Sequence, residues 1–247
     1  MNDYVDTVRS RAEYDTSVDV GLRNFMLGVY WKLALGLLLT GAISYTVANV
    51  PAVRDYFFLV DGDGRLRGMT VLGLIAQWMP LAIILMTMFM RQISAKASGL
   101  IYWTIVSAIG LGGAAWFLIY NLGSIANIFF VTASAFGALS LWGYVTKRNL
   151  TGWGNFLFMA AWGLIFAMIG NMFFFHNEGF RLVASLIGVL IFAAFTAYDT
   201  QMLKGVYYQL GGNPSRMAVA TNVGALNFYL DFINMFQFLL SIFGSRR

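Results

Sequence analysis

Long apolar runs separated by short polar breaks fill almost the whole chain. Seven runs are long enough for a helix to cross a hydrocarbon core of roughly 30 Å, at about 1.5 Å per residue. None shows the alternation of a barrel strand, so each is predicted to be a helix that satisfies its own backbone hydrogen bonds. The pattern therefore predicts an all-α membrane protein, a bundle of seven transmembrane helices. The predicted spans are residues 25–49, 71–90, 99–120, 125–145, 155–175, 182–203 and 223–243.

The segment before the first span is polar. Residues 1–24 mix both charge signs and lack the basic, apolar and small-residue order of a cleaved signal peptide. We expect a polar N-terminal tail here, either flexible or lying in the membrane interface. Residues 25–247 are then one transmembrane domain, and any chemistry takes place in or beside the bilayer.

One connection contains a motif that begins like a calcium-binding loop. The stretch "DGDGRLRGM" at 61–69 has the first acidic residues of such a loop. However, Arg65 takes a ligand position and Leu72 stands where the closing glutamate would be. We predict a turn instead.

Composition and charge agree with the span pattern. Hydrophobic residues make up 59% of the chain and charged residues only 11%, against about 25% charged in soluble domains. Ten Lys and Arg residues fall on the side of the N-terminus and six on the other, which predicts a cytoplasmic N-terminus. The net charge of +5 is explained by basic loops on an anionic leaflet, so no nucleic-acid partner is expected. Cysteine is absent, which excludes disulfides and thiolate metal sites.

Two acidic residues lie inside the predicted spans, away from their ends. Asp199 is about four residues before the end of the sixth span, and Asp231 is about eight residues after the start of the seventh. The two spans are consecutive and antiparallel, so the carboxylates are expected to lie on one level of the membrane and to meet. Arg91, at the end of the second span, is expected at a similar level. Intramembrane charge is expensive and marks a functional site by default.

Polar residues also recur around Asp231. Asn227, Asp231 and Asn234 share one helical face, and Gln237 follows. This stripe favours a central place for the last helix in the bundle. The three amides are expected either to line a pore or to hold helices together through hydrogen bonds.

These residues carry a resemblance to a known family. The motifs "AYDTQ" at 197–201 and "YLDFINMF" at 229–236, the opening "FMLGVYWKLALGLLLTG" at 25–41 and the seven spans resemble the Bax-inhibitor family of membrane proteins. The resemblance extends from about residue 22 to the end of the chain, and the aspartate motifs are its specific part.

The resemblance implies a pH-sensitive calcium leak. In such a protein an aspartate pair on the last two helices senses protons, and an arginine on the second helix latches the closed form. The matching residues here are Asp199 and Asp231 as sensor and calcium path, and Arg91 as latch. The resemblance also implies a multi-pass protein, here of a bacterial inner membrane, and an association with a membrane-bound AAA protease.

The chemistry of the pair is compatible with that implication. Two carboxylates close together in a poorly solvated site cannot both ionise cheaply, so the pair is expected to share a proton. Carboxylate oxygens are also the ligands that calcium prefers. We expect protons and calcium to compete for Asp199 and Asp231, with calcium as a transported ion and no permanently bound cofactor.

Three alternatives compete with the leak. Asp199 could simply reach the interface or cap a neighbouring helix. The chain could be a non-conducting regulator of a membrane protease or a stress response. A carboxylate dyad also suggests an intramembrane aspartyl protease, but those enzymes carry small residues before the second aspartate. Phe228, Tyr229 and Leu230 stand there instead, so no enzymatic activity is expected.

Overall fold

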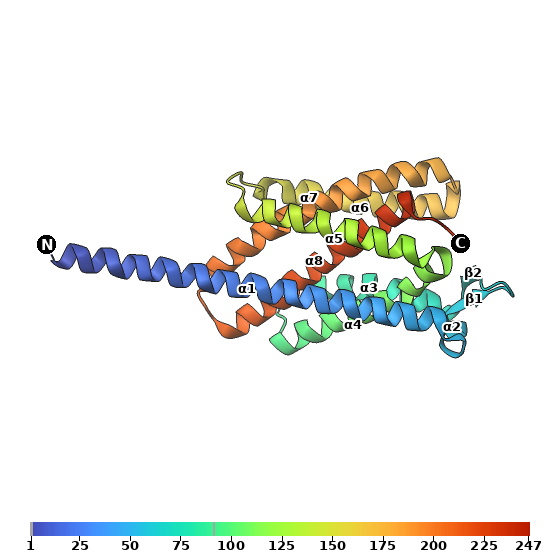
Figure 1. The fold of residues 1–247 in the computed structure, drawn as a ribbon, viewed down its shortest axis with the longest axis horizontal. Helices are drawn as coiled ribbons and strands as arrows, with labels where there is room; N and C mark the ends of the chain where they lie inside the picture. The colour runs from blue at the N-terminus through green and yellow to red at the C-terminus, as the bar shows by residue number, and fades with distance from the viewer. Residues whose placement is uncertain (1, 91) are drawn as a thin grey trace.

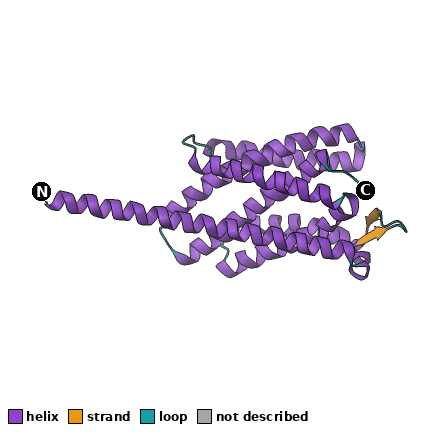
Figure 2. Ribbon diagram, viewed as in Figure 1, coloured by secondary structure: helices purple, strands orange, loops and turns teal. Residues whose placement is uncertain are grey.

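The chain folds almost entirely into helices (Figure 2). The computed structural model describes residues 2–90 and 92–247. A short two-stranded hairpin is the exception, and it lies at the end of the molecule opposite the N-terminus (Figures 1 and 2). In chain order the elements are α1 (Asn2–Asn49), α2 (Pro51–Phe57), β1 (Phe58–Val60), β2 (Leu66–Met69), α3 (Val71–Met88), α4 (Ala95–Ile119), α5 (Leu122–Val145), the 3₁₀ turn η1 (Thr151–Trp153), α6 (Gly154–Gly170), the π turn η2 (Asn171–Phe175), α7 (Glu178–Leu210) and α8 (Pro214–Phe243).

Six helical segments in the described part of the chain are long and apolar enough to cross a membrane. A seventh, Val71–Thr87, is apolar but shorter, so the predicted count of seven crossings stays a prediction. The chain is a multi-pass integral membrane protein. The cytoplasmic N-terminus also stays a prediction. The six segments are Val20–Asn49, Ala95–Ile119, Leu122–Val145, Thr151–Phe175, Glu178–Leu210 and Pro214–Phe243.

Helix α1 is longer than the apolar pattern suggested. It begins at Asn2 and runs without a break into the first span, so residues 2–24 are helical rather than a flexible tail. No proline or glycine occurs between residues 2 and 20 to interrupt it. In Figure 1 its N-terminal part extends beyond the other helices. The domain boundary at residue 24 stays a prediction.

The acidic motif at 61–69 is a hairpin turn, as predicted. Strands β1 and β2 pair antiparallel, and residues 61–65 of the motif form the turn between them. The Oδ1 atom of Asp61 accepts hydrogen bonds from the backbone N–H groups of Arg65 at 2.8 Å and Asp63 at 3.1 Å, and its Oδ2 accepts one from Arg67 at 3.0 Å. The Arg65 N–H and the Arg67 guanidinium hold the pKa of Asp61 below its usual range. The carboxylate therefore closes a turn.

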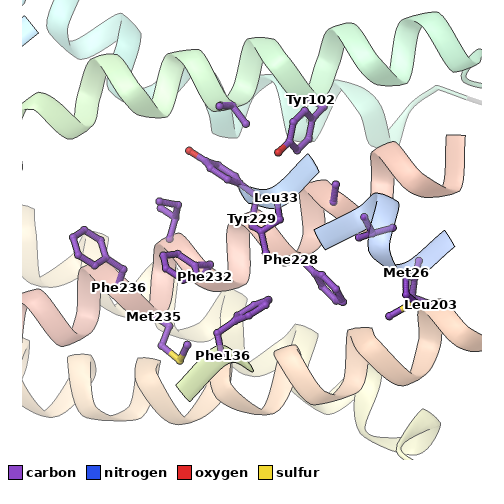
Figure 3. Close-up of a cluster of buried hydrophobic side chains, with 14 of the residues drawn as sticks. Met26, Leu33, Tyr102, Phe136, Leu203, Phe228, Tyr229, Phe232, Met235 and Phe236 are labelled. Atoms are coloured by element: carbon purple, nitrogen blue, oxygen red, sulfur yellow. The ribbon is translucent and has the colours of Figure 1, made fainter. Parts of the chain in front are cut away.

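Helix α8 packs against α1, α4, α5 and α7, and one aromatic face of it contacts α1, α4 and α5. Figure 3 shows this face between Tyr102 of α4 on one side and Phe136 of α5 on the other. The predicted place of α8 at the centre of the bundle stays a prediction. The buried residues of the face are Phe228, Tyr229, Phe232, Met235 and Phe236.

Specific contacts hold that aromatic face in one orientation. The ring of Phe228 lies 5.3 Å from that of Tyr30 and 5.6 Å from that of Phe136, measured between centroids. The hydroxyl of Tyr229 is hydrogen-bonded to Thr40 Oγ1 at 2.7 Å. Both Phe228 and Tyr229 are fully buried, so any rotation of α8 would disrupt rings and a buried hydrogen bond together.

Close approach of α5 and α7 depends on one glycine. A Cβ atom at Gly143 would lie 2.3 Å from the carbonyl oxygen of Ala197 and 2.8 Å from its Cα. Small residues allow such backbone contact between membrane helices. Gly137, two turns earlier in α5, has no atom within 4 Å of that position.

We predict that Gly143→Ala lowers the thermal stability of the protein in detergent micelles, because α5 and α7 must separate. The expected loss is about 1–3 kcal/mol of unfolding free energy. Circular dichroism during heating measures it. Gly137→Ala in the same helix is the matched control, and its melting temperature is expected to equal that of wild type. Equal melting temperatures for the two variants would contradict the close approach.

Candidate functional site

The two aspartates singled out by the sequence line one cavity. Asp199 comes from α7 and Asp231 from α8, and the cavity has a volume of about 790 Å³. Within residues 2–90 and 92–247, five helices line the cavity. Helices α3, α6, α7 and α8 each contribute several residues, and α4 contributes Ile109 alone. The two carboxylates from the last two long helices therefore line one cavity, and direct contact between them stays a prediction.

Both aspartates lie farther from their helix ends than the span lengths suggested. Helix α7 continues eleven residues past Asp199, about 16 Å, and α8 begins seventeen residues before Asp231, about 25 Å. The reason is that capping and not hydrophobicity ends these helices. Gly211 closes α7 in a left-handed conformation with φ 56°, and Asn213 caps α8 by accepting from the N–H of Arg216.

Asp231 is the most enclosed charged side chain of the site. Only 4% of its surface is exposed, and its Oδ2 atom is buried without a hydrogen-bond partner in the described part of the chain. The carboxylate of Asp199 acts on it electrostatically, and the side chain of Asn227 acts on Asp199. A buried carboxylate oxygen without a partner is costly, so a ligand or a proton would stabilise it.

The predicted polar stripe of α8 faces the same cavity. Asn227, Asn234 and Gln237 all line it. The amide of Asn234 donates to the backbone carbonyl of Leu230 at 2.8 Å, which leaves its oxygen available to a ligand. The structure thus brings every predicted site residue except Arg91 to one cavity. Arg91 lies outside the described residues, so its predicted role as latch stays a prediction.

Sequence reasoning missed further polar residues of the cavity. Gln77 of α3, Asn155 of α6 and Tyr198 of α7 also line it. Gln77 is an amide inside a predicted span, so a scan for amides as well as acids would have found it. Nothing in the sequence indicated that Tyr198 lines the cavity. It directly precedes Asp199, and consecutive residues of a helix point in different directions.

A second cavity adjoins the first. It has a volume of about 290 Å³ and lies between α3, α4 and α8. Gln77, Pro80, Ile109 and Gln237 line both cavities, so two amides stand where the cavities meet. Beyond them the second cavity reaches Tyr120, at the end of α4.

Comparisons with known proteins show that almost the whole chain is similar to one family. Residues 22–247 match the family model described as inhibitor of apoptosis-promoting Bax1. An uncharacterised protein of Caulobacter vibrioides is 52% identical over 234 residues, which cover 94% of this chain and 93% of that protein. The inner membrane protein YbhL of Escherichia coli is 39% identical over 228 residues, covering 92% and 94% of the two chains. An uncharacterised protein of Rickettsia prowazekii is 36% identical over 248 residues, the full length of both.

We predict that Asp231→Asn stabilises the folded protein. The substitution removes a buried charge whose oxygen has no partner, and function commonly keeps such groups at the expense of stability. The expected gain is about 1–3 kcal/mol, measured by thermal denaturation in detergent at about pH 8. Asp63→Asn makes the same chemical change at an exposed hairpin position and is expected to have no effect. A lower melting temperature for Asp231→Asn would show that the carboxylate is well satisfied.

Proposed function

This chain belongs to the family of the inhibitor of apoptosis-promoting Bax1, and we propose that it is a passive, pH-sensitive calcium leak of the membrane. The observation that carries the proposal is the pair of carboxylates, Asp199 and Asp231, on two helices of one cavity. In this proposal Val71–Thr87 is the seventh crossing, the N-terminus is cytoplasmic, and the protein has no catalytic activity.

The cavity offers the ligands that calcium takes. Carboxylates and side-chain amide oxygens are hard donors that bind this ion with flexible geometry. Two carboxylates and the amides of Asn227, Asn234 and Gln237 supply them. No cluster of three or more His, Cys, Asp or Glu residues occurs in the described part of the chain. A pair with surrounding amides is suited to an ion that passes rather than one that stays.

A route away from the aspartates is supported by the second cavity. Gln77 and Gln237 stand at the junction of the two cavities, and Pro80 lines both. Proline has no N–H, so the carbonyl of Ala76, four residues earlier in α3, lacks its usual helical partner. Ala76 lines the second cavity, where such an oxygen can replace part of an ion's hydration shell.

Protons supply the regulation. Protonation removes the charge that attracts calcium, so protons and calcium compete for Asp199 and Asp231. Among the described residues that line the cavity, Tyr198 is the other titratable one. Arg91 is retained as the latch, since Ile84, seven residues before it in the sequence, lines the cavity from α3.

The packing of α8 speaks against the protease alternative. Intramembrane aspartyl proteases carry small residues before the second aspartate, whereas Phe228 and Tyr229 stand there and are fully buried among aromatic rings. The non-conducting regulator remains the second candidate, acting on a membrane-bound AAA protease. It differs from the leak in predicting no calcium flux from the purified protein alone.

We predict that purified protein in calcium-loaded liposomes releases calcium at a rate that changes between about pH 6 and about pH 8, because the aspartates exchange protons. Asp199→Asn and Asp231→Asn are each expected to abolish that change, and a fluorescent calcium indicator measures the flux. Asp63→Asn is the matched control and should behave as wild type. No flux from any of the proteins would favour the regulator. A pH dependence that survives both substitutions would remove the aspartates from the mechanism.

We also predict that acid weakens calcium binding. Calcium is expected to raise the melting temperature of the wild-type protein more at about pH 8 than at about pH 6, because fewer carboxylates then carry protons. Scanning fluorimetry over a calcium series measures the shift. Asp231→Asn should lose it at both values. A shift that is equal at both values would show that calcium binds elsewhere.

A further inference from the structure

The cavity of Asp199 and Asp231 has a second kind of wall that ion conduction does not use. Facing the polar stripe of α8 are aromatic side chains from three other helices. The ring centroids of Phe158 and Trp162 lie 6.2 Å apart, and those of Phe192 and Phe195 lie 5.9 Å apart. Trp78 completes this wall from α3. A calcium ion with its hydration shell gains nothing from such a surface.

We propose that this cavity is a binding site for a small amphipathic amine, whose ammonium group pairs with Asp231 and whose apolar body lies against the aromatic wall. The Oδ2 atom of Asp231 is buried and has no partner within the described residues, so a donor is missing at this position. An ammonium group supplies both the donor and the charge. The rings add attraction for the cation through their faces and for its body through contact.

Charge selects the class of ligand. Among the described residues that line the cavity, two are acidic and none is basic. Anionic ligands are therefore repelled. Neutral ligands leave the Asp231 oxygen unsatisfied. A lipid headgroup with an amine also brings a phosphate close to two carboxylates, which disfavours it against a simple amine.

Size and access fit the same class. A volume of about 790 Å³ lies within the range of roughly 300–1,000 Å³ that is typical for sites of drug-sized molecules. Helix α3 packs mainly on α4, and α6 packs mainly on α7. The two helices therefore belong to different groups of helices, and each group forms one wall of the cavity (Figure 1). Trp78 of α3 is 40% exposed and Phe158 of α6 is 50% exposed, although both line the cavity. The cavity therefore opens on the side of the bundle, where an amphipathic molecule dissolved in lipid can enter.

The test compares a charged probe with a neutral one of the same shape. Full-length protein in phosphatidylcholine nanodiscs is dialysed to equilibrium against naphthylmethylamine or naphthylmethanol near neutral pH, where the amine is protonated, and binding to empty nanodiscs is subtracted. Wild type is expected to bind the amine at least about tenfold more tightly than the alcohol. Asp231→Asn is expected to bring the two affinities within about twofold of each other, with little change for the alcohol.

Two further variants keep the result interpretable. Ala161→Trp fills the cavity from α6 and is expected to weaken both probes, whereas Asp63→Asn in the hairpin should change neither. Unchanged circular dichroism is required of each variant. Equal affinities for the two probes in wild type would overturn the proposal, and so would a preference for the amine that persists in Asp231→Asn.

The proposal is independent of ion conduction. Binding is measured at equilibrium and without an ion gradient, so its failure differs from a failure of the leak. Amine binding without calcium flux would overturn the leak alone. Calcium flux without any preference for the amine would overturn the amine site alone.

Discussion

The rotation of α8 about its own axis decides where the polar groups of this protein point. Phe228, Tyr229 and their aromatic neighbours are buried against α1, α4 and α5. Asn227, Asp231 and Asn234 follow the stripe beside this face, and all three line the cavity. Breaking the aromatic contacts would expose apolar rings only to lipid, but it would also free the buried hydroxyl of Tyr229 from Thr40. Packing, rather than any bond of the aspartate itself, holds Asp231 in place.

The same arrangement explains why a costly group persists. A membrane offers no water to a misplaced carboxylate, so an intramembrane aspartate must face other protein groups or a cavity. Asn227 acts on Asp199, but the Oδ2 atom of Asp231 is left without a protein partner in the described residues. A cation or a hydrogen-bond donor would therefore stabilise this buried oxygen. Calcium, a proton and an ammonium group are three ways to stabilise it, and they would exclude one another.

Much of the site could be predicted from individual residues. Asp199 and Asp231 stood out because acids inside apolar spans are rare, and the amides of α8 stood out through helical spacing. The family follows from the motifs around them and is confirmed by the match over residues 22–247. Gln77 was missed because the spans were searched for acids and not for amides, and Tyr198 because nothing in the sequence marks it as a cavity residue. The aromatic wall was missed for the same reason as Tyr198, since a phenylalanine in a span has no mark that separates a cavity from lipid.

The sequence by itself determined the membrane class, the approximate spans, the family and the two carboxylates, because these depend on the transfer of side chains from water and on motifs along the chain. It did not determine the ends of α7 and α8, since helix caps lie beyond the apolar runs. Only the tertiary structure decided that α3 and α6 line the cavity of the aspartates, that two amides line both cavities, and that aromatic rings share a cavity with the carboxylates. Those facts depend on which helices touch, and contacts between distant segments are set by the shapes of packed side chains rather than by local pattern.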